Sequence, residues 1–322
     1  MVHLIGAPFD LCSPTLGSRL GPIAVRMSGL GNALTRLGVA WEDRGDIAEV
    51  DADIPDYQGR VEAAIPVYRD LRDRVAQSMK GGAVPMVIGG DHSLAIGSIS
   101  GALKVHGSEL GVLWIDAHMD LNTPDTSPSG NIHGMPLAAL AGMSTGPAKN
   151  PEQAPILNAA WKEILSDIVP ATRLDLTKTA WVGLRDVDPG EVANWKKMNA
   201  GPALTMQDVD RDRISGVMEA IDEWAHRVGV SKLWISFDVD SLDPFFAPGT
   251  GTKVRGGLTY REGHLIAELL CEMFRDSGRP MTLVGLDVVE VNPLTDQAGE
   301  TARMANEWVA SLFGNTIMGA QI

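Results

Sequence analysis

Short apolar runs alternate along the chain with longer stretches of helical periodicity. The apolar runs predict strands at 3–5, 38–42, 84–88, 112–115, 180–184, 233–237 and 282–286. Apolar residues at helical spacing predict helices at 214–228, 265–273 and 302–313. Most of these strands hold too few polar residues to be half exposed, which is typical of a parallel sheet covered on both faces. The pattern therefore predicts an α/β protein with a central, mainly parallel sheet.

Two clusters of glycine, proline and polar residues interrupt this alternation, at 122–134 and 146–155. Neither cluster separates two independent sets of strands and helices, so we interpret both as surface loops of a single domain, 1–322. A helix is expected at 156–168 after the second cluster. We interpret residues 141–180 as an excursion before the strand at 180–184.

The amino-acid composition and net charge disfavour several classes of protein. The 322 residues are 44% hydrophobic and 21% charged, as in a soluble globular protein. No apolar run reaches the roughly 20 residues that span a bilayer, and no basic leader precedes Asp10, so we expect a cytoplasmic protein without a membrane segment. A net charge of −14 disfavours nucleic acid and anionic lipid as partners and suits a cationic or metal-bound small molecule.

Acidic and imidazole side chains directly follow several of the expected strands. They occur in Gly89-Gly90-Asp91-His92-Ser93, Asp116-Ala117-His118-Met119-Asp120 and Asp238-Val239-Asp240, in the stretch 186–191, and at Glu290. In open α/β sheets the ligand crevice lies at the carboxyl ends of the strands. On an extended backbone, the spacing of two that separates Asp116, His118 and Asp120 turns all three side chains to one face.

So many carboxylates repel one another unless cations are present. The four aspartates Asp116, Asp120, Asp238 and Asp240 carry −4, which two divalent cations would balance if His92 and His118 are neutral. Oxygen-rich ligation without thiolate favours Mn²⁺ or Mg²⁺ over structural zinc. Ions that share carboxylates lie about 3.5–4 Å apart.

Two other interpretations of these acids compete with a metal site. A single aspartate after a strand is commonly a helix N-cap. The run that begins at Asp238 partly matches a calcium-binding EF-hand loop, but its sixth residue is Asp243 where glycine is required and its twelfth is Gly249 where glutamate is required. The recurrence of acids at several strand ends favours the metal site.

These motifs, together with Ser236-Phe237-Asp238-Val239-Asp240-Ser241-Leu242-Asp243-Pro244, resemble the arginase/agmatinase family of ureohydrolases over nearly the whole chain. The resemblance implies a three-layer α/β/α fold, two Mn(II) ions per subunit, and a homotrimer or homohexamer. It implies that one ion is held by His92, Asp116, Asp120 and Asp238, and the second by Asp116, His118, Asp238 and Asp240. The stretch 12–20 matches the family poorly, and we assign it no role.

The loops at 122–134 and 183–191 resemble the arginase branch of the family. By that resemblance, the α-carboxylate of arginine would be bound by Asn122, Ser127, Ser129 and Asn131, and its α-ammonium side would face Asp188 and Glu191. The chemistry agrees, because hydroxyls and amides donate to carboxylates whereas carboxylates accept from ammonium. The alternative is that the Ser/Asn loop is simply solvated.

The implied reaction is hydrolysis of L-arginine to L-ornithine and urea by a hydroxide that bridges the two Mn(II) ions. Glu290 would hold the guanidinium with help from Thr252, and Asp120 would pass a proton to the leaving nitrogen with His133 as shuttle. The alternatives are another guanidino hydrolase, such as agmatinase or guanidinobutyrase, or a non-catalytic regulatory subunit of the same fold.

Overall fold

An eight-stranded sheet forms the centre of the computed structural model, which describes residues 1–51 and 53–318. Every neighbouring pair of strands is parallel, in the order β2-β1-β3-β8-β7-β4-β5-β6. The strands are β1 (Val2–Gly6), β2 (Trp41–Asp46), β3 (Val84–Ile88), β4 (Leu110–Ile115), β5 (Thr179–Leu184), β6 (Ala203–Thr205), β7 (Lys232–Asp238) and β8 (Thr282–Val289). The predicted α/β class and parallel sheet are confirmed.

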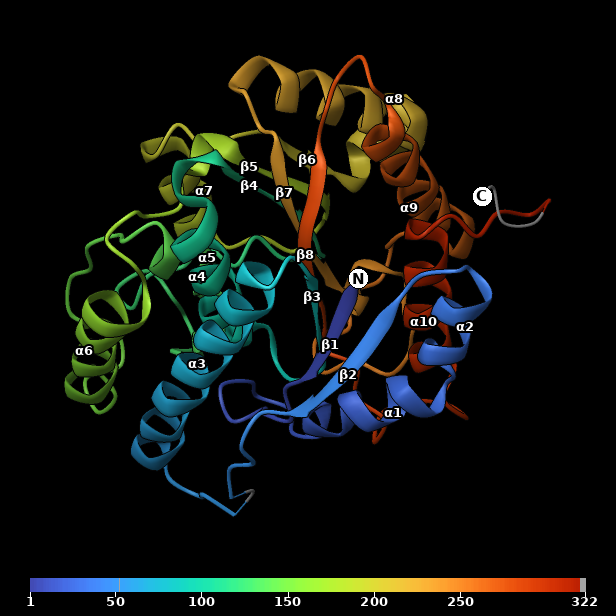
Figure 1. Cartoon of the computed structure of the whole chain (residues 1–322). Helices are drawn as coiled ribbons and strands as arrows, with labels where there is room; N and C mark the ends of the chain where they lie inside the picture. Colours follow the sequence, from blue (N-terminus) through green and yellow to red (C-terminus); the bar gives the residue numbers. More distant parts are fainter. Residues whose placement is uncertain (52, 319–322) are drawn as a thin grey trace.

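Helices cover both faces of this sheet (Figure 1). They are α1 (Gly21–Met27), α2 (Leu30–Arg36), α3 (Tyr57–Lys80), α4 (Ala95–His106), α5 (Pro136–Leu140), α6 (Ala154–Glu163), α7 (Pro189–Lys197), α8 (Met206–Val228), α9 (Tyr260–Arg275) and α10 (Glu300–Leu312). One hydrophobic core joins α3, α4, α5 and α6 to one face, and a second joins α1, α2, α8, α9 and α10 to the other. The protein is thus a three-layer α/β/α structure.

The central strands are mostly apolar because successive side chains enter different cores. On β4, Val112 and Trp114 belong to one core, while Leu113 and Ile115 belong to the other. Alternation of side chains across a strand produces this division. Polar residues are consequently rare inside these strands, although Ser236 on β7 and Asp287 on β8 are buried there, and they gather at the strand ends.

Two strands differ from the prediction by three residues or more at one or both ends, and one strand was not expected. The strand expected at 38–42 begins at Trp41, because Gly38 is in a turn with φ 70° and the pairing with β1 starts at Trp41. The short edge strand β6 was not expected, since three residues carry too little pattern to identify. The strand expected at 282–286 continues to Val289, so that Glu290 follows β8 directly.

The excursion at 141–180 packs against α3. It contains α6 and the π-helical turn Ile164–Ile168, where a helix was expected at 156–168. Trp161 is buried, and its Nε1 donates to Met143 O at 3.0 Å. Arg69 of α3 donates from Nε to Asp167 Oδ2 at 2.9 Å. The excursion is therefore an integrated part of one outer layer.

The helix expected at 214–228 is the second part of α8, which bends at Arg213 (φ 59°). In the described part of the chain, no helix is both long enough and apolar enough to cross a membrane.

Candidate metal centre and active site

The site residues come from five strands that are neighbours in the sheet. Their order is β3, β8, β7, β4 and β5, and all run parallel. Their carboxyl ends therefore form one continuous edge. This edge carries His92 after β3, Glu290 after β8, Asp238 at the end of β7, Asp116 after β4 and Asp188 after β5.

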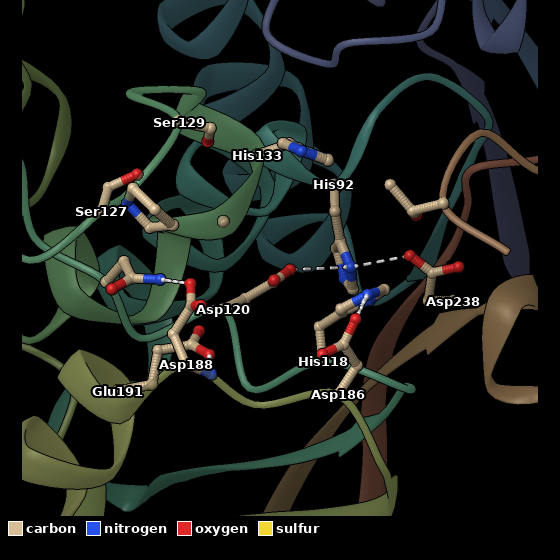
Figure 2. Close-up of a pocket in the computed structure, with 14 residues that line it drawn as sticks. His92, His118, Asp120, Ser127, Ser129, His133, Asp186, Asp188, Glu191 and Asp238 are labelled. Atoms are coloured by element: carbon tan, nitrogen blue, oxygen red, sulfur yellow. Dashed lines mark hydrogen bonds and ion pairs between the residues drawn. The ribbon is translucent and has the colours of Figure 1, made fainter. Parts of the chain in front are cut away.

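His92 is the centre of the first group of candidate ligands. Its Nδ1 lies 2.9 Å from Asp116 Oδ2, 3.1 Å from Asp238 Oδ2 and 3.2 Å from Asp120 Oδ2. His92, Asp116 and Asp120 offer ligand atoms that all lie within 4.8 Å of one another. Figure 2 shows His92, Asp120 and Asp238 directed toward a common point.

The second group is built around His118 and shares Asp116 with the first. His118 Nδ1 lies 3.1 Å from Asp240 Oδ2 and 3.3 Å from Asp116 Oδ1. These three side chains again offer ligand atoms within 4.8 Å of one another. Because the two oxygens of Asp116 face different histidines, the arrangement is that of two adjacent cation positions with a bridging carboxylate.

The atoms at these positions fit divalent cations. Among the described residues, the buried atoms His92 Nδ1 and Asp116 Oδ2 have no hydrogen-bond partner despite their proximity. Burial, and then the charge of Asp116, raises the pKa of Asp120 well above its usual value. The pKa of Asp238 is raised in the same way by burial and then by Asp240. Unpaired lone pairs and uncompensated negative charge are what cations would satisfy.

Two residues that the sequence analysis did not identify hold His92 in place. Its Nε2 lies 2.8 Å from Ser236 Oγ, and its ring stacks on Trp114 with centroids 3.9 Å apart. A hydrogen bond at Nε2 leaves the Nδ1 lone pair free for a cation. The signal for Ser236 was its spacing of two from Asp238 on β7, which places both side chains on one face.

The N-cap interpretation of the aspartates is also correct in part. Asp238 Oδ1 accepts from Asp240 N at 2.7 Å, and Asp116 Oδ1 accepts from His118 N at 2.6 Å. In each aspartate, Oδ2 faces His92. One carboxylate therefore fixes the local turn and presents an oxygen to the candidate metal position at the same time.

Glu290 lies beneath this centre and is only 1% exposed. Its Oε1 accepts from His92 N at 2.9 Å and lies 3.3 Å from His133 Nδ1. Its Oε2 is buried and has no hydrogen-bond partner in the described chain. Glu290 and Asp120 both have positive φ, 62° and 52°, which is a strained backbone for residues other than glycine. Thr252 Oγ1 donates to Asp240 Oδ2 at 2.9 Å.

A cavity of about 140 Å³ opens above the centre. Its lining includes eleven of the predicted site residues: His92, His118, Asp120, Asp238, His133, Asn122, Ser127, Ser129, Asp188, Glu191 and Thr252. Asp116, Asp240 and Glu290 lie behind the lining, and Asn131 lies outside it. Asp186 also lines the cavity, with Oδ2 4.0 Å from His118 Nε2, and the sequence analysis gave it no role.

The polar groups are separated across this cavity. Figure 2 shows Ser127 and Ser129 at upper left, Asp188 and Glu191 at lower left, and His92, His118 and Asp238 to the right of both pairs. Asn122 Nδ2 donates to Asp188 Oδ2 at 2.9 Å. Glu191 accepts from Leu121 N at 3.0 Å and from Asp188 N at 2.9 Å, and burial raises its pKa to about 7. Glu191 thus fixes the backbone that presents Asp188.

The stretch 12–20, to which the sequence analysis assigns no role, contacts residues beside the site. Cys12 N donates to Asp91 Oδ2 at 2.9 Å, and His133 N donates to Cys12 O at 3.4 Å. Asn292 Nδ2 donates to Leu16 O at 3.1 Å. The stretch therefore links the backbone near His92, His133 and the end of β8.

Comparisons with known proteins agree with this geometry. The model of the arginase family matches residues 1–314. The chain is 38% identical to an arginase of Staphylococcus aureus over 98% of both chains, and 39% identical to arginase-1 of Rattus norvegicus over 97% of this chain and 92% of that one. The native structure of an arginase from Bacillus caldovelox superposes with a TM-score of 0.85, at 37% identity over 98% of this chain and 99% of that one. The chain belongs to the arginase family.

Proposed function

We propose that this protein hydrolyses L-arginine to L-ornithine and urea at two Mn²⁺ ions held by His92, Asp116, His118, Asp120, Asp238 and Asp240. The observation that carries the proposal is the cavity itself. Its floor is the paired histidine–aspartate centre, and its walls bear the hydroxyls of Ser127 and Ser129 on one side and the carboxylate of Asp188, bound by Asn122, on another. A long amino acid with a cationic terminal group is complementary to all three surfaces.

Glu290 orients the guanidinium from directly behind the cavity lining, where it contacts the lining residues His92 and His133. Its Oε1 is already engaged by His92 N, whereas its buried Oε2 has no partner among the described residues. An unpaired buried carboxylate oxygen is a strong acceptor for a guanidinium N–H. The contact directs the guanidinium carbon toward the centre, where Thr252 Oγ1 donates to Asp240 Oδ2.

Two Mn²⁺ ions, when bound, would supply hydroxide near neutral pH by lowering the pKa of a coordinated water. Asp120, which lines the cavity beside the centre, takes up the proton that the attacking water loses and transfers it to the departing nitrogen as the bond from that nitrogen to the guanidinium carbon breaks. His133 exchanges protons between the site and solvent. It also lines the cavity. Burial lowers the pKa of His133, but the hydrogen bond to Glu290 and the charge of Glu290 outweigh this effect and raise the pKa above its ordinary value.

The other end of the substrate determines specificity. Ser127 and Ser129 donate to the α-carboxylate, and Asp188, held by Asn122 and Glu191, accepts from the α-ammonium side. A site built to bind a charged group is left with unpaired polar atoms when that group is missing. Agmatine lacks the carboxylate and is therefore the informative competitor.

The test is a urea-release assay with arginine, agmatine and 4-guanidinobutyrate, with and without Mn²⁺. We expect kcat/KM for arginine to exceed that for agmatine by about 10³ or more, and activity to depend on added metal. Equal values for arginine and agmatine would assign the chain to agmatine or guanidinobutyrate hydrolysis. No urea from any substrate, with metal bound, would favour a non-catalytic subunit.

We also propose that the protein assembles as a homotrimer or homohexamer. The support is its similarity to the family over residues 1–314. Light scattering at micromolar concentration measures the assembly directly.

A further inference from the structure

The loop at 122–134 carries the groups proposed for the α-carboxylate, yet it contains little regular structure. Its only helical turn in the described structure is Ile132–Gly134. Most of the hydrogen bonds inside the loop join residues 122–127, among them Ser127 N to Thr123 O at 2.9 Å. Gly130 N donates to Ser127 Oγ at 3.0 Å and Asn131 N donates to Ser129 Oγ at 3.2 Å. The part of the loop from 128 to 131 therefore has few internal bonds and depends on contacts from other segments.

Tyr57, the first residue of α3, makes such a contact from far away in the sequence. Its hydroxyl donates to Gly130 O at 2.8 Å across 73 residues. The turn that carries Tyr57 is fixed, since Asp56 caps α3 by accepting from Gly59 N at 2.8 Å. Burial raises the pKa of Tyr57 well above its ordinary value, so the phenol keeps its proton and remains a donor.

Gly130 is a sensitive point for this contact. It has φ 75°, a left-handed conformation that favours glycine, and it lies between Ser129 and Asn131. Its N–H is bound by Ser127 and its C=O by Tyr57, so both peptide groups beside Gly130 are oriented. The direction of the Ser129 side chain follows from the orientation of these peptides.

The excursion holds the same loop from a second direction. Lys149 Nζ donates to Thr126 O at 2.6 Å. Gln153 packs against Gly130 so closely that a Cβ added there would lie 2.3 Å from Gln153 Oε1. The loop is thereby fixed at Thr126 and at Gly130, the two positions that flank Ser127 and Ser129.

We propose that Tyr57 is a positioning residue that sets the affinity for the α-carboxylate by holding the 122–134 loop in its binding conformation. The inference rests on the proposed function and extends it to residues outside the cavity lining. A pre-ordered loop avoids the loss of conformational entropy that a loose loop incurs on binding. Loss of the Tyr57 hydroxyl should consequently weaken binding of carboxylate-bearing ligands and leave the chemical step intact.

The experiment compares Tyr57→Phe with Tyr260→Phe in the Mn²⁺-loaded protein. Tyr260 is a matched control, because it is the first residue of α9 and its hydroxyl donates to Glu307 Oε2 at 3.0 Å, far from the loop in sequence. Steady-state kinetics are measured with arginine and agmatine. Calorimetry measures binding of L-ornithine and of putrescine, the same diamine without the carboxylate.

For Tyr57→Phe we expect the KM for arginine and the Kd for ornithine to rise about fivefold to tenfold, the loss of one hydrogen bond, with kcat within twofold. Putrescine binding and kcat/KM for agmatine should stay unchanged, as should every value for Tyr260→Phe. Lys149→Met, which leaves α3 intact, should change the same two constants in the same direction.

Equal weakening of ornithine and putrescine, a fall in kcat at constant KM, or wild-type constants in Tyr57→Phe would overturn the inference. The wild-type protein separates this failure from failure of the proposed function. If wild type does not prefer arginine over agmatine, the proposed function is wrong. If wild type prefers arginine and Tyr57→Phe behaves like wild type, only the role of Tyr57 is wrong.

Discussion

Asp287 illustrates how single buried residues support the site. It lies on β8 with no exposed surface, and it accepts from Trp234 Nε1 at 2.8 Å and from Ser236 Oγ at 3.4 Å. Ser236 in turn contacts His92 Nε2. Asp287 therefore holds the hydroxyl that orients the ring of His92. Residues that hydrogen-bond to a metal ligand in this way commonly affect metal affinity.

The same burial makes Asp287 a source of pH-dependent stability. Burial raises its pKa in the folded protein to about 6, above the unfolded value of 3.8. The folded state therefore binds the proton more tightly, and the associated stability is present below pH 3.8 and is lost as pH rises through 6. We expect Asp287→Asn, compared with wild type, to gain about 2 kcal/mol in free energy of unfolding between pH 4.5 and 7. Urea unfolding of chelator-treated protein measures this difference, and parallel pH profiles would contradict it.

At the scale of elements, most of the fold followed from the sequence. Seven of the eight strands were placed, since buried parallel strands are apolar without interruption. The edge strand β6 was missed because its three residues carry no period, and the end of β8 was placed too early. Because these strands are parallel, their acidic carboxyl ends lie at one edge of the sheet, and the sequence pattern was sufficient to predict this.

Contacts between distant side chains could not be predicted in this way. The pair His92–Ser236 spans 144 residues, and Tyr57–Gly130 spans 73. Such pairs depend on the exact depth and rotation of packed elements, which hydrophobic periodicity does not encode. The same limit applies to Cys12, whose backbone contacts Asp91 and His133 although its stretch carries no recognisable pattern.

The excursion offers a test at the element scale. Trp161 is 2% exposed and anchors α6 to the core that also contains α3 and α4. We expect Trp161→Ala to lower the free energy of unfolding by about 3–5 kcal/mol, because it leaves a large cavity. The exposed neighbour Lys162→Ala should change it by less than about 0.5 kcal/mol. Urea unfolding followed by circular dichroism measures both, and similar effects of the two variants would show that the excursion adds little to the core.

When no cations are bound, the negative charge of the molecule and of the candidate centre destabilises the folded protein. The chain carries a net charge of −14, and carboxylates of the centre, among them Asp120, Asp238 and Asp240, have raised pKa values from burial and mutual repulsion. These carboxylates, which the proposed function requires, therefore lower the free energy of unfolding of the metal-free protein. Bound Mn²⁺ should raise it again, since a ligand that binds only the folded state stabilises that state.

One variant tests how this negative charge affects stability with and without metal. At a free Mn²⁺ concentration about 100 times Kd, each site adds about 2.7 kcal/mol, which for a chain of this length raises Tm by about 4 °C. Asp238→Asn keeps an oxygen for the Asp240 amide but removes a charge from the centre. We therefore expect the metal-free variant to melt above metal-free wild type, and to lose most of the Mn²⁺-dependent rise, metal content and urea release. Scanning calorimetry and elemental analysis of both proteins, with and without chelator, measure these quantities. An Asp238→Asn protein that melts below metal-free wild type but binds two ions would contradict both the repulsion and the ligand assignment.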